Sequence, residues 1–266
     1  MIEKANQSNS AVAREEKVLF KGPSGNLEGL TFGLTSTVIP PLIGVICHPH
    51  PLYQGTMNNK VVTTIAKAWQ ELGLPTVRFN FRGVGASEGS YGNGVGEIED
   101  LQAVLAELQQ QYPQVNFWLA GFSFGSFIAL SVATQQRFPK RFPIQALLTV
   151  APPVHHFDFL NLQIPPCPWL IIQGLLDTVV PADKVLSWVE EIKKTEKTVR
   201  SRTNANEMNG SAQGPTPTLT VNLNSNKDQC GIELVTMPTA EHFFHGQLVE
   251  LKSIIQNKMQ LLIQKA

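Results

Sequence analysis

The sequence predicts an α/β protein in which a mostly parallel central sheet carries helices on both faces. From about residue 40 onward, short runs rich in β-branched and aromatic residues alternate with segments whose apolar residues recur at helical spacing. The chain has 266 residues, and a chain of that size buries about 70–75% of its unfolded surface. We therefore expect one domain over residues 17–266, preceded by a flexible segment at residues 1–16.

The expected elements follow in chain order. Before residue 40, two segments predict an antiparallel hairpin that leads into the sheet. Beyond the hairpin, Val61, Ile65 and Leu72 illustrate the helical pattern, because their spacing places them on one apolar face. The expected strands are 17–22, 27–34, 42–47, 75–81, 116–120, 146–150, 169–173 and 232–237. The expected helices are 61–72, 98–112, 126–134, 185–192 and a last one from about residue 247.

One segment interrupts this alternation. Residues 194–230 are rich in Asn, Thr, Ser, Gly and Pro, and they hold too few apolar residues to pack against a core. A loop of that length is usually either functional or disordered. We expect a disordered surface insertion at about 194–230.

Charge and apolar runs limit the classes of partner. Lysine plus arginine and aspartate plus glutamate both total 21, so the formal net charge is zero and no global field attracts nucleic acid or an anionic membrane. No run approaches the ~20 apolar residues that span a bilayer, and residues 1–17 lack the apolar core of a signal peptide. We therefore expect a cytoplasmic protein with a small-molecule partner, and the oligomeric state stays open.

A serine lies at a sharp predicted turn between a strand and a helix. The residues from Gly121 to Gly125 read GFSFG and fit the pattern G-x-S-x-G, with Ser123 at its centre. Glycines are needed at the flanking positions because side chains there would clash with neighbouring backbone. The turn presents the Ser123 hydroxyl at a helix N-terminus, which makes it the candidate nucleophile.

A serine hydroxyl needs a base, and the base needs a group that orients it. Asp177 follows the strand 169–173, where its carboxylate can accept from an imidazole; Asp158 is the reserve candidate. The base is expected after the last strand, where the sequence offers His242 and His245. We choose Asp177 and His242, because the acid precedes the base in this arrangement and His242 is nearer to the strand end.

The remaining requirement is a pair of N–H donors for the oxyanion of a tetrahedral intermediate. One is expected to be the N–H of Phe124, and the other an N–H of the loop HPHPLYQG that follows the strand 42–47. The prolines of this loop fix φ near −65° and leave the amides of His50 and Leu52 as possible donors. We favour His50. His48 and Tyr53 either line a pocket or bond within the loop.

Metal and nucleotide sites are the competing interpretations. Cys47, Cys167 and Cys230 form no CxxC pair, and EHFFH is neither HExxH nor HxxEH. The six histidines do occur as HPH, HH and HxxH, so a composite zinc site stays open as an alternative. The glycine loop after the strand 75–81 gives no G-x-G-x-x-G register, and we expect Arg82 and Ser87 to hold it together by hydrogen bonds. The preferred interpretation therefore has no metal and no cofactor.

Taken together, these motifs resemble the α/β-hydrolase superfamily, and within it a group of small bacterial hydrolases described as dienelactone-hydrolase-like. The segments that carry the resemblance are HPHPLYQGTMNNKVV, RFNFRGVGASEG, LAGFSFGS, VAPPV, IIQGLLDTVVP and EHFFHG. It implies an α/β-hydrolase fold with a minimal cap. The chain departs from the group at Ser126, often glycine, at Leu175, often aspartate, and at Glu241, commonly aspartate. Dienelactone hydrolases themselves carry cysteine where this chain has Ser123.

The resulting functional hypothesis is a serine hydrolase of the carboxylesterase or thioesterase kind. Its triad of Ser123, Asp177 and His242 cleaves small-molecule esters or thioesters through an acyl-enzyme. The alternatives are a peptidase or acyltransferase on the same triad, or a non-catalytic scaffold of the same fold. The short segment 152–166 predicts an open site, whose rim either holds His155, His156, Phe157 and Phe159 or leaves them as exposed loop residues.

Overall fold

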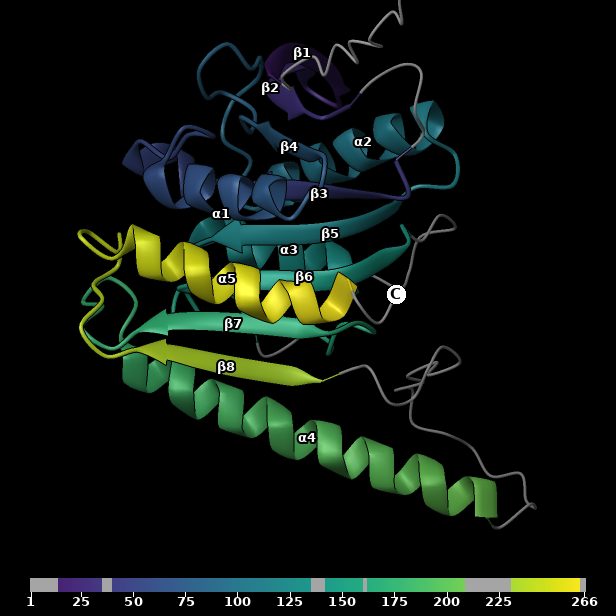
Figure 1. The fold of residues 1–266 in the computed structure, drawn as a ribbon, viewed down its shortest axis with the longest axis vertical. Coiled ribbons are helices and arrows are strands. Elements are labelled where there is room, and N and C mark those ends of the chain that lie inside the picture. The colour runs from purple at the N-terminus through teal and green to yellow at the C-terminus, as the bar shows by residue number, and fades with distance from the viewer. Residues whose placement is uncertain (1–13, 35–39, 135–141, 160–161, 209–230, 264–266) are drawn as a thin grey trace, which may run out of the picture.

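A computed structural model describes residues 14–34, 40–134, 142–159, 162–208 and 231–263 (Figure 1). Eight strands of these residues form one sheet in the order β1-β2-β4-β3-β5-β6-β7-β8. The strands are β1 (Glu15–Gly22), β2 (Gly25–Phe32), β3 (Leu42–Cys47), β4 (Thr76–Phe79), β5 (Asn116–Phe122), β6 (Ile144–Val150), β7 (Trp169–Gly174) and β8 (Ile232–Met237). The helices are α1 (Lys60–Glu71), α2 (Val95–Gln111), α3 (Phe124–Thr134), α4 (Ala182–Met208) and α5 (Leu248–Ile263).

The sheet is mostly parallel, as the sequence predicts. Among the described strands, β2 alone runs against the others: it pairs antiparallel with β1, from Glu15 opposite Phe32 to Gly22 opposite Gly25, and antiparallel with β4 on its other side. Every other neighbouring pair is parallel. The predicted fold class and hairpin are therefore confirmed.

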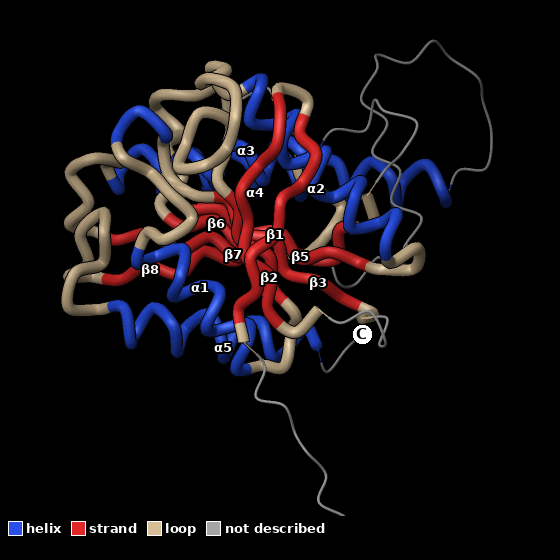
Figure 2. Tube along the Cα trace, turned by 90° about the horizontal axis from the view of Figure 1, so that it is seen from above, coloured by secondary structure: helices blue, strands red, loops and turns tan. Residues whose placement is uncertain are grey.

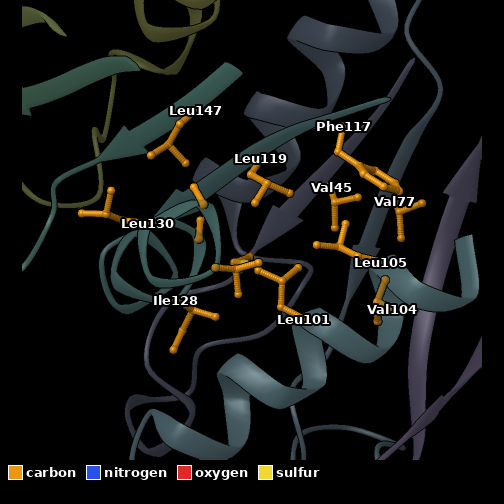
Figure 3. Close-up of a cluster of buried hydrophobic side chains, with 14 of the residues drawn as sticks. Val45, Val77, Leu101, Val104, Leu105, Phe117, Leu119, Ile128, Leu130 and Leu147 are labelled. Atoms are coloured by element: carbon orange, nitrogen blue, oxygen red, sulfur yellow. The ribbon is translucent and has the colours of Figure 1, made fainter. Parts of the chain in front are cut away.

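Helices cover both faces of the sheet (Figure 2). α1 and α5 lie together on one face, where Trp69 and Ile255 belong to the same buried cluster. α2, α3 and α4 lie on the other face, and their side chains form a second cluster with the sheet. Figure 3 shows Leu101 and Leu105 of α2 close to the sheet residue Val45, within this second cluster. The two apolar layers hold the strands, and hence their loops, in fixed relative positions.

Several helix boundaries differ from the prediction, among them the start of α2 and the end of α4. α2 begins at Val95 rather than residue 98, because the Glu97 carboxylate accepts from the N–H groups of Gly92 and Gly94 and caps its first turn. α4 continues to Met208 rather than ending near residue 192, so the first part of the expected insertion is helical. Lysine, glutamate and arginine recur in this stretch and are strong helix formers.

Several expectations fall on residues that the structure does not describe. Residues 1–13, within the segment expected to be flexible, and residues 209–230, within the expected insertion, lie outside the described ranges, as does Cys230. Between β6 and β7, where a cap would be inserted, the described residues form neither helix nor strand. None of the helices in the described ranges combines the length and the apolar character needed to cross a membrane.

Candidate active site

The carboxyl ends of the parallel strands meet at one edge of the sheet, to the left in Figure 1, where β5, β7 and β8 end. The loops at this edge bring together residues that lie far apart in the sequence. Ser123 follows β5, Asp177 follows β7 and His242 follows β8, whereas His50 follows β3. Loops at the carboxyl ends of such strands are the usual location of ligand sites in open α/β sheets.

Ser123 lies on a strained turn between β5 and α3. Its φ angle is 53°, in the left-handed region that non-glycine residues rarely adopt, and its N–H donates to Val150 O at 2.8 Å. A Cβ atom at Gly121 would collide with the carbonyl oxygen of Gly125, so the turn requires glycine there. The Ser123 side chain remains partly exposed at the start of α3.

The same turn presses against the end of β3. A Cβ at Gly125 would collide with Cys47 O and would approach His48 O to 2.7 Å. The first turn of α3 therefore touches the loop that carries His50. Ser126, one of the departures from the family pattern, is buried, and its hydroxyl donates to the Gly121 and Val150 carbonyls, at 2.8 and 3.1 Å. The extra hydroxyl thus stabilises the turn.

Asp177 and His242 form a buried pair. His242 Nδ1 lies 2.8 Å from Asp177 Oδ2, and both side chains are almost fully buried. The other carboxylate oxygen, Oδ1, accepts from the N–H groups of Val179 and Val180 at 2.9 and 2.7 Å, which fixes the orientation of the carboxylate. Because a carboxylate accepts, Nδ1 carries the proton that it donates, and Nε2 of the neutral ring is left with a lone pair.

The imidazole lies beside the serine turn without a hydrogen bond to it. The ring centroid of His242 is 5.0 Å from that of Phe122, the residue before Ser123. Within the described ranges, Ser123 Oγ makes no hydrogen bond with His242. The two reserve residues, Asp158 and His245, are both exposed, and neither takes part in the Asp177–His242 pair.

The HPHP loop leaves one amide without a protein partner. His50 precedes a short 3-10 helix, η1 (Pro51–Tyr53), and its Nδ1 accepts from the N–H of Leu52 at 3.2 Å. Within the described residues the N–H of His50 donates to no protein group, and the N–H of Phe124, at the first position of α3, has no partner in its helix. The rings of His50 and Phe124 have centroids 4.9 Å apart. Two free amides therefore belong to residues whose side chains touch.

Comparison with known proteins identifies the family. A family model described as alpha/beta hydrolase fold matches residues 52–166. A solved α/β serine hydrolase homologue from Coxiella burnetii is 42% identical, with a TM-score of 0.71, and the match covers 94% of this chain and 99% of that one. This chain belongs to the α/β-hydrolase family.

Two further proteins are similar to this chain. This hydrolase is 33% identical to an α/β serine hydrolase without a lid from Xanthomonas campestris, with a TM-score of 0.71 and coverage of 93% and 94% of the two chains. It is also 42% identical over 181 residues to the Rickettsia prowazekii protein RP471, and this match covers 66% of this chain and 73% of that protein. The chain is therefore an α/β serine hydrolase in general terms.

His48 and Tyr53 differ in role within the hydrolase. His48 is fully buried; its Nδ1 lies 2.6 Å from Pro49 O, and its Nε2 accepts from the N–H of Phe81 at 3.0 Å. Burial lowers the pKa of His48 to about 4, so the ring is neutral at pH 7. His48 thus joins the ends of β3 and β4 and faces no open space, whereas Tyr53 is 83% exposed.

Sequence reasoning missed Tyr91. This residue belongs to the glycine loop, and its Oη lies 3.0 Å from His50 Nε2. The signal was present: a lone aromatic residue in a glycine-rich loop that follows a parallel strand faces the same sheet edge as the serine turn. Of the four rim candidates, Phe157 is half-buried with its ring 5.3 Å from Phe124, but Phe159 is buried against Trp188 and forms no rim.

Buried polar side chains hold the glycine loop in place, and they include Arg82 and Ser87, as the sequence predicts. The Arg82 guanidinium lies 2.7 Å from Asp100 Oδ1, and the backbone N–H of Arg82 donates to Asp100 Oδ2 at 2.9 Å. The Ser87 hydroxyl donates to Asn80 O at 2.7 Å. Both contacts attach the loop to the sheet and to α2.

The zinc alternative finds little support in the site of the hydrolase. His242 Nδ1 is committed to Asp177, and His245 is exposed. Across the described ranges, no cluster of three or more His, Cys, Asp or Glu side chains has a geometry that could hold a metal ion. At this edge of the sheet, His242 instead pairs with Asp177, and Ser123 lies on the neighbouring turn.

Proposed function

We propose that this serine hydrolase cleaves carboxylic esters or thioesters of small molecules through an acyl-enzyme. The observation that carries the proposal is the buried pair of His242 and Asp177, 2.8 Å apart, beside a strained turn that presents Ser123. A histidine held by a carboxylate in one tautomer is the arrangement that can deprotonate a serine hydroxyl at neutral pH.

In the first half-reaction Ser123 Oγ attacks the carbonyl carbon, and its proton passes to His242 Nε2. The Asp177 carboxylate stabilises the imidazolium, and the carbonyl oxygen becomes an oxyanion. As the carbonyl re-forms, the bond to the alcohol or thiol breaks and His242 returns the proton to the leaving group. The Ser123–His242 hydrogen bond that this requires forms on substrate binding, because such bonds are often long in the free enzyme.

In the second half-reaction a water molecule takes the place of the leaving group. His242 accepts a proton from that water, and the hydroxide attacks the acyl carbon. As the second tetrahedral intermediate collapses, the ester bond to Ser123 breaks, His242 returns the proton to Ser123 Oγ and the carboxylic acid leaves. All proton transfers pass through His242, so this chemistry needs no metal or organic cofactor.

The oxyanion is held by two backbone donors, the N–H groups of Phe124 and His50. The support for His50 over Leu52 is that the Leu52 amide already donates to His50 Nδ1, whereas the His50 amide has no partner among the described residues. Donors of this kind, directed at the developing charge, supply about 2.7–4 kcal/mol each.

The surroundings of Ser123 favour small esters with apolar groups. Several apolar side chains on the loops after β7 and β8 are exposed at the same edge of the sheet, namely Leu175, Leu176, Val179 and Phe243. The segment between β6 and β7 forms no helix or strand in its described part, and we expect it to leave the site open. Within the family, the motifs favour the small dienelactone-hydrolase-like group, whereas dienelactone hydrolases themselves carry cysteine at the position of Ser123.

The first experiment is hydrolysis of nitrophenyl esters from acetate to octanoate by the wild type and Ser123→Ala. We expect the kcat of Ser123→Ala to fall by about 10⁴-fold or more, because no other group can form the acyl-enzyme. Ser131→Ala is the matched control: Ser131 lies in α3 and its buried hydroxyl has no partner among the described residues, so its loss should leave kcat unchanged.

A fluorophosphonate probe tests the nucleophile independently of the substrate. It should label wild-type Ser123 and spare Ser123→Ala. Folded protein that is labelled but hydrolyses no ester or thioester would move the assignment to an acyltransferase or a peptidase on the same triad. Folded protein that is neither labelled nor active would favour a non-catalytic scaffold.

A further inference from the structure

The hydrogen bonds of His50 extend beyond its own loop. Its imidazole accepts from Leu52 N–H through Nδ1 at 3.2 Å, and its Nε2 lies 3.0 Å from the hydroxyl oxygen of Tyr91. The two bonds fix the tautomer, because a backbone N–H can only donate. Nδ1 is therefore the acceptor, Nε2 carries the ring proton, and that proton is donated to Tyr91 Oη.

The surroundings of the His50 imidazole favour its neutral form. Burial lowers the pKa of His50 from its ordinary value, although the Glu97 charge opposes the shift. A protonated imidazole would have no lone pair on Nδ1 and would lose the Leu52 bond. The half-buried ring also packs against Phe124, with centroids 4.9 Å apart, so its orientation is fixed on two sides.

Tyr91 is itself anchored by a buried carboxylate. The N–H of Gly92, the next residue, donates to Glu97 Oε1 at 2.8 Å, and the N–H of Gly94 donates to Oε2 at 2.7 Å. Glu97 is fully buried at the start of α2. A Cβ at Gly92 would approach Gly96 Cα to 2.8 Å, so the loop lies tightly on that helix. The backbone next to Tyr91 is thus attached to α2, an element outside the HPHP loop.

We propose that Tyr91 is a positioning residue for the oxyanion site, acting through the His50 imidazole. The hydroxyl of Tyr91 holds the His50 imidazole in place by a hydrogen bond, and this imidazole accepts from the N–H of Leu52. The backbone N–H of His50 is left free to face the oxyanion beside the N–H of Phe124. This rests on the proposed function, because the site has a use only if Ser123 attacks an acyl carbon. Loss of the Tyr91 hydroxyl would loosen a donor that acts in the transition state.

The decisive variant is Tyr91→Phe, which keeps the ring and removes one oxygen. We expect kcat to fall about 10- to 100-fold with KM nearly unchanged, because small misplacements of catalytic donors have effects of this size. Tyr53→Phe is the matched control. Its ring also contacts His50, at 4.9 Å, but its hydroxyl is not bonded to that ring, so kcat should match the wild type. Unfolding temperatures verify that both variants fold.

A second series separates the ring from the amide. His50→Ala keeps the backbone N–H but removes the acceptor for Leu52, and its kcat should fall by about 100-fold. His50→Asn restores an acceptor at the first position before the helix, where asparagine caps well, and should recover part of the loss. In His50→Asn the further change Tyr91→Phe should have no effect, because the bond that it removes is already absent. Equal losses in both backgrounds would overturn the proposal.

Nitrogen-15 NMR of His50 provides a readout that a merely structural role would not move. The wild type should show the tautomer with the proton on Nε2, and Tyr91→Phe should introduce the other tautomer. A wild-type ring with its proton on Nδ1 would overturn the proposal, since that atom could not accept from Leu52.

The labelling rate of Ser123 by the fluorophosphonate separates this proposal from the proposed function. The phosphoryl oxygen of the probe occupies the oxyanion site, so Tyr91→Phe should be labelled more slowly even if no ester is a substrate. Normal labelling and normal kcat in Tyr91→Phe, with Ser123→Ala inactive, would overturn the positioning role alone. Absence of labelling in the wild type would overturn both.

Discussion

Single residues at the sheet edge are held in conformations that only their surroundings can maintain. Ser123 keeps a φ angle of 53° and Phe244, two residues after His242, keeps the same value. Left-handed φ angles at residues other than glycine cost about 1–3 kcal/mol each and cluster at functional turns. At Ser123 the strain is offset by the buried turn around it.

The carboxylate of Asp177 allows a test at the scale of one residue. Asp177→Asn keeps the size of the side chain but presents an amide to His242 Nδ1, which favours the wrong tautomer. We expect kcat for the best ester to fall by about 10⁴-fold, measured by steady-state kinetics. Asp158→Asn, the exposed alternative, should stay within about twofold of the wild type. Similar losses in the two variants would contradict the assignment.

At the scale of elements, the site depends on contacts between loops that follow different strands. Gly125 at the start of α3 touches the carbonyls of Cys47 and His48, while His48 Nε2 accepts from the N–H of Phe81 after β4. Three neighbouring strands are therefore connected just where they end. The prolines of the HPHP loop add stiffness, because their φ angles are fixed before folding.

His48 makes the stability of this junction depend on pH. Its pKa is about 4 in the folded protein and about 6.5 when unfolded, so between these values the unfolded chain binds more protons. Stability should therefore fall as pH decreases from 6.5 to 4, by about 3 kcal/mol from this group. Urea unfolding should show a smaller pH-dependent loss in His48→Gln, which keeps an acceptor but does not titrate. Identical pH dependence in both proteins would exclude His48 as the cause.

At the scale of the whole molecule, one sheet separates two apolar layers. Leu105 of α2 belongs to the layer formed with α3 and α4, and Ile255 of α5 belongs to the layer formed with α1 (Figures 1 and 2). Both layers pack on the same strands, so neither can open without exposing the other side of the sheet. We propose on this ground that the chain unfolds as one unit.

Truncation on each face tests this cooperativity. Leu105→Ala and Ile255→Ala should each lower the free energy of unfolding by about 2–5 kcal/mol, in a single transition followed by denaturant titration. The residues are fully buried, whereas Leu261 is 53% exposed, so Leu261→Ala should change stability by less than about 0.5 kcal/mol. Two separate transitions in either truncated variant would show that the faces fold independently.

The sequence by itself determined the order of the elements and the identity of the candidate triad. Alternating strand and helix patterns are local, and G-x-S-x-G lies within five residues, so both can be read without knowing what packs against them. Asp177 and His242 were found from their places after successive strands, because parallel strands bring their carboxyl ends to one edge. The 2.8 Å contact between the two side chains depends on the tertiary structure, and it agrees with this choice.

Tertiary structure alone decided how the loops meet. Nothing in HPHP distinguishes the buried His48, bonded to Phe81, from the half-buried His50, bonded to Tyr91. The extension of α4 to Met208 and the burial of Phe159 were equally hidden. Local patterns report the intrinsic preferences of a segment, whereas partners that are distant along the chain are selected by packing of the whole sheet. The sequence therefore specified the chemistry, and the fold specified which side chains hold it in position.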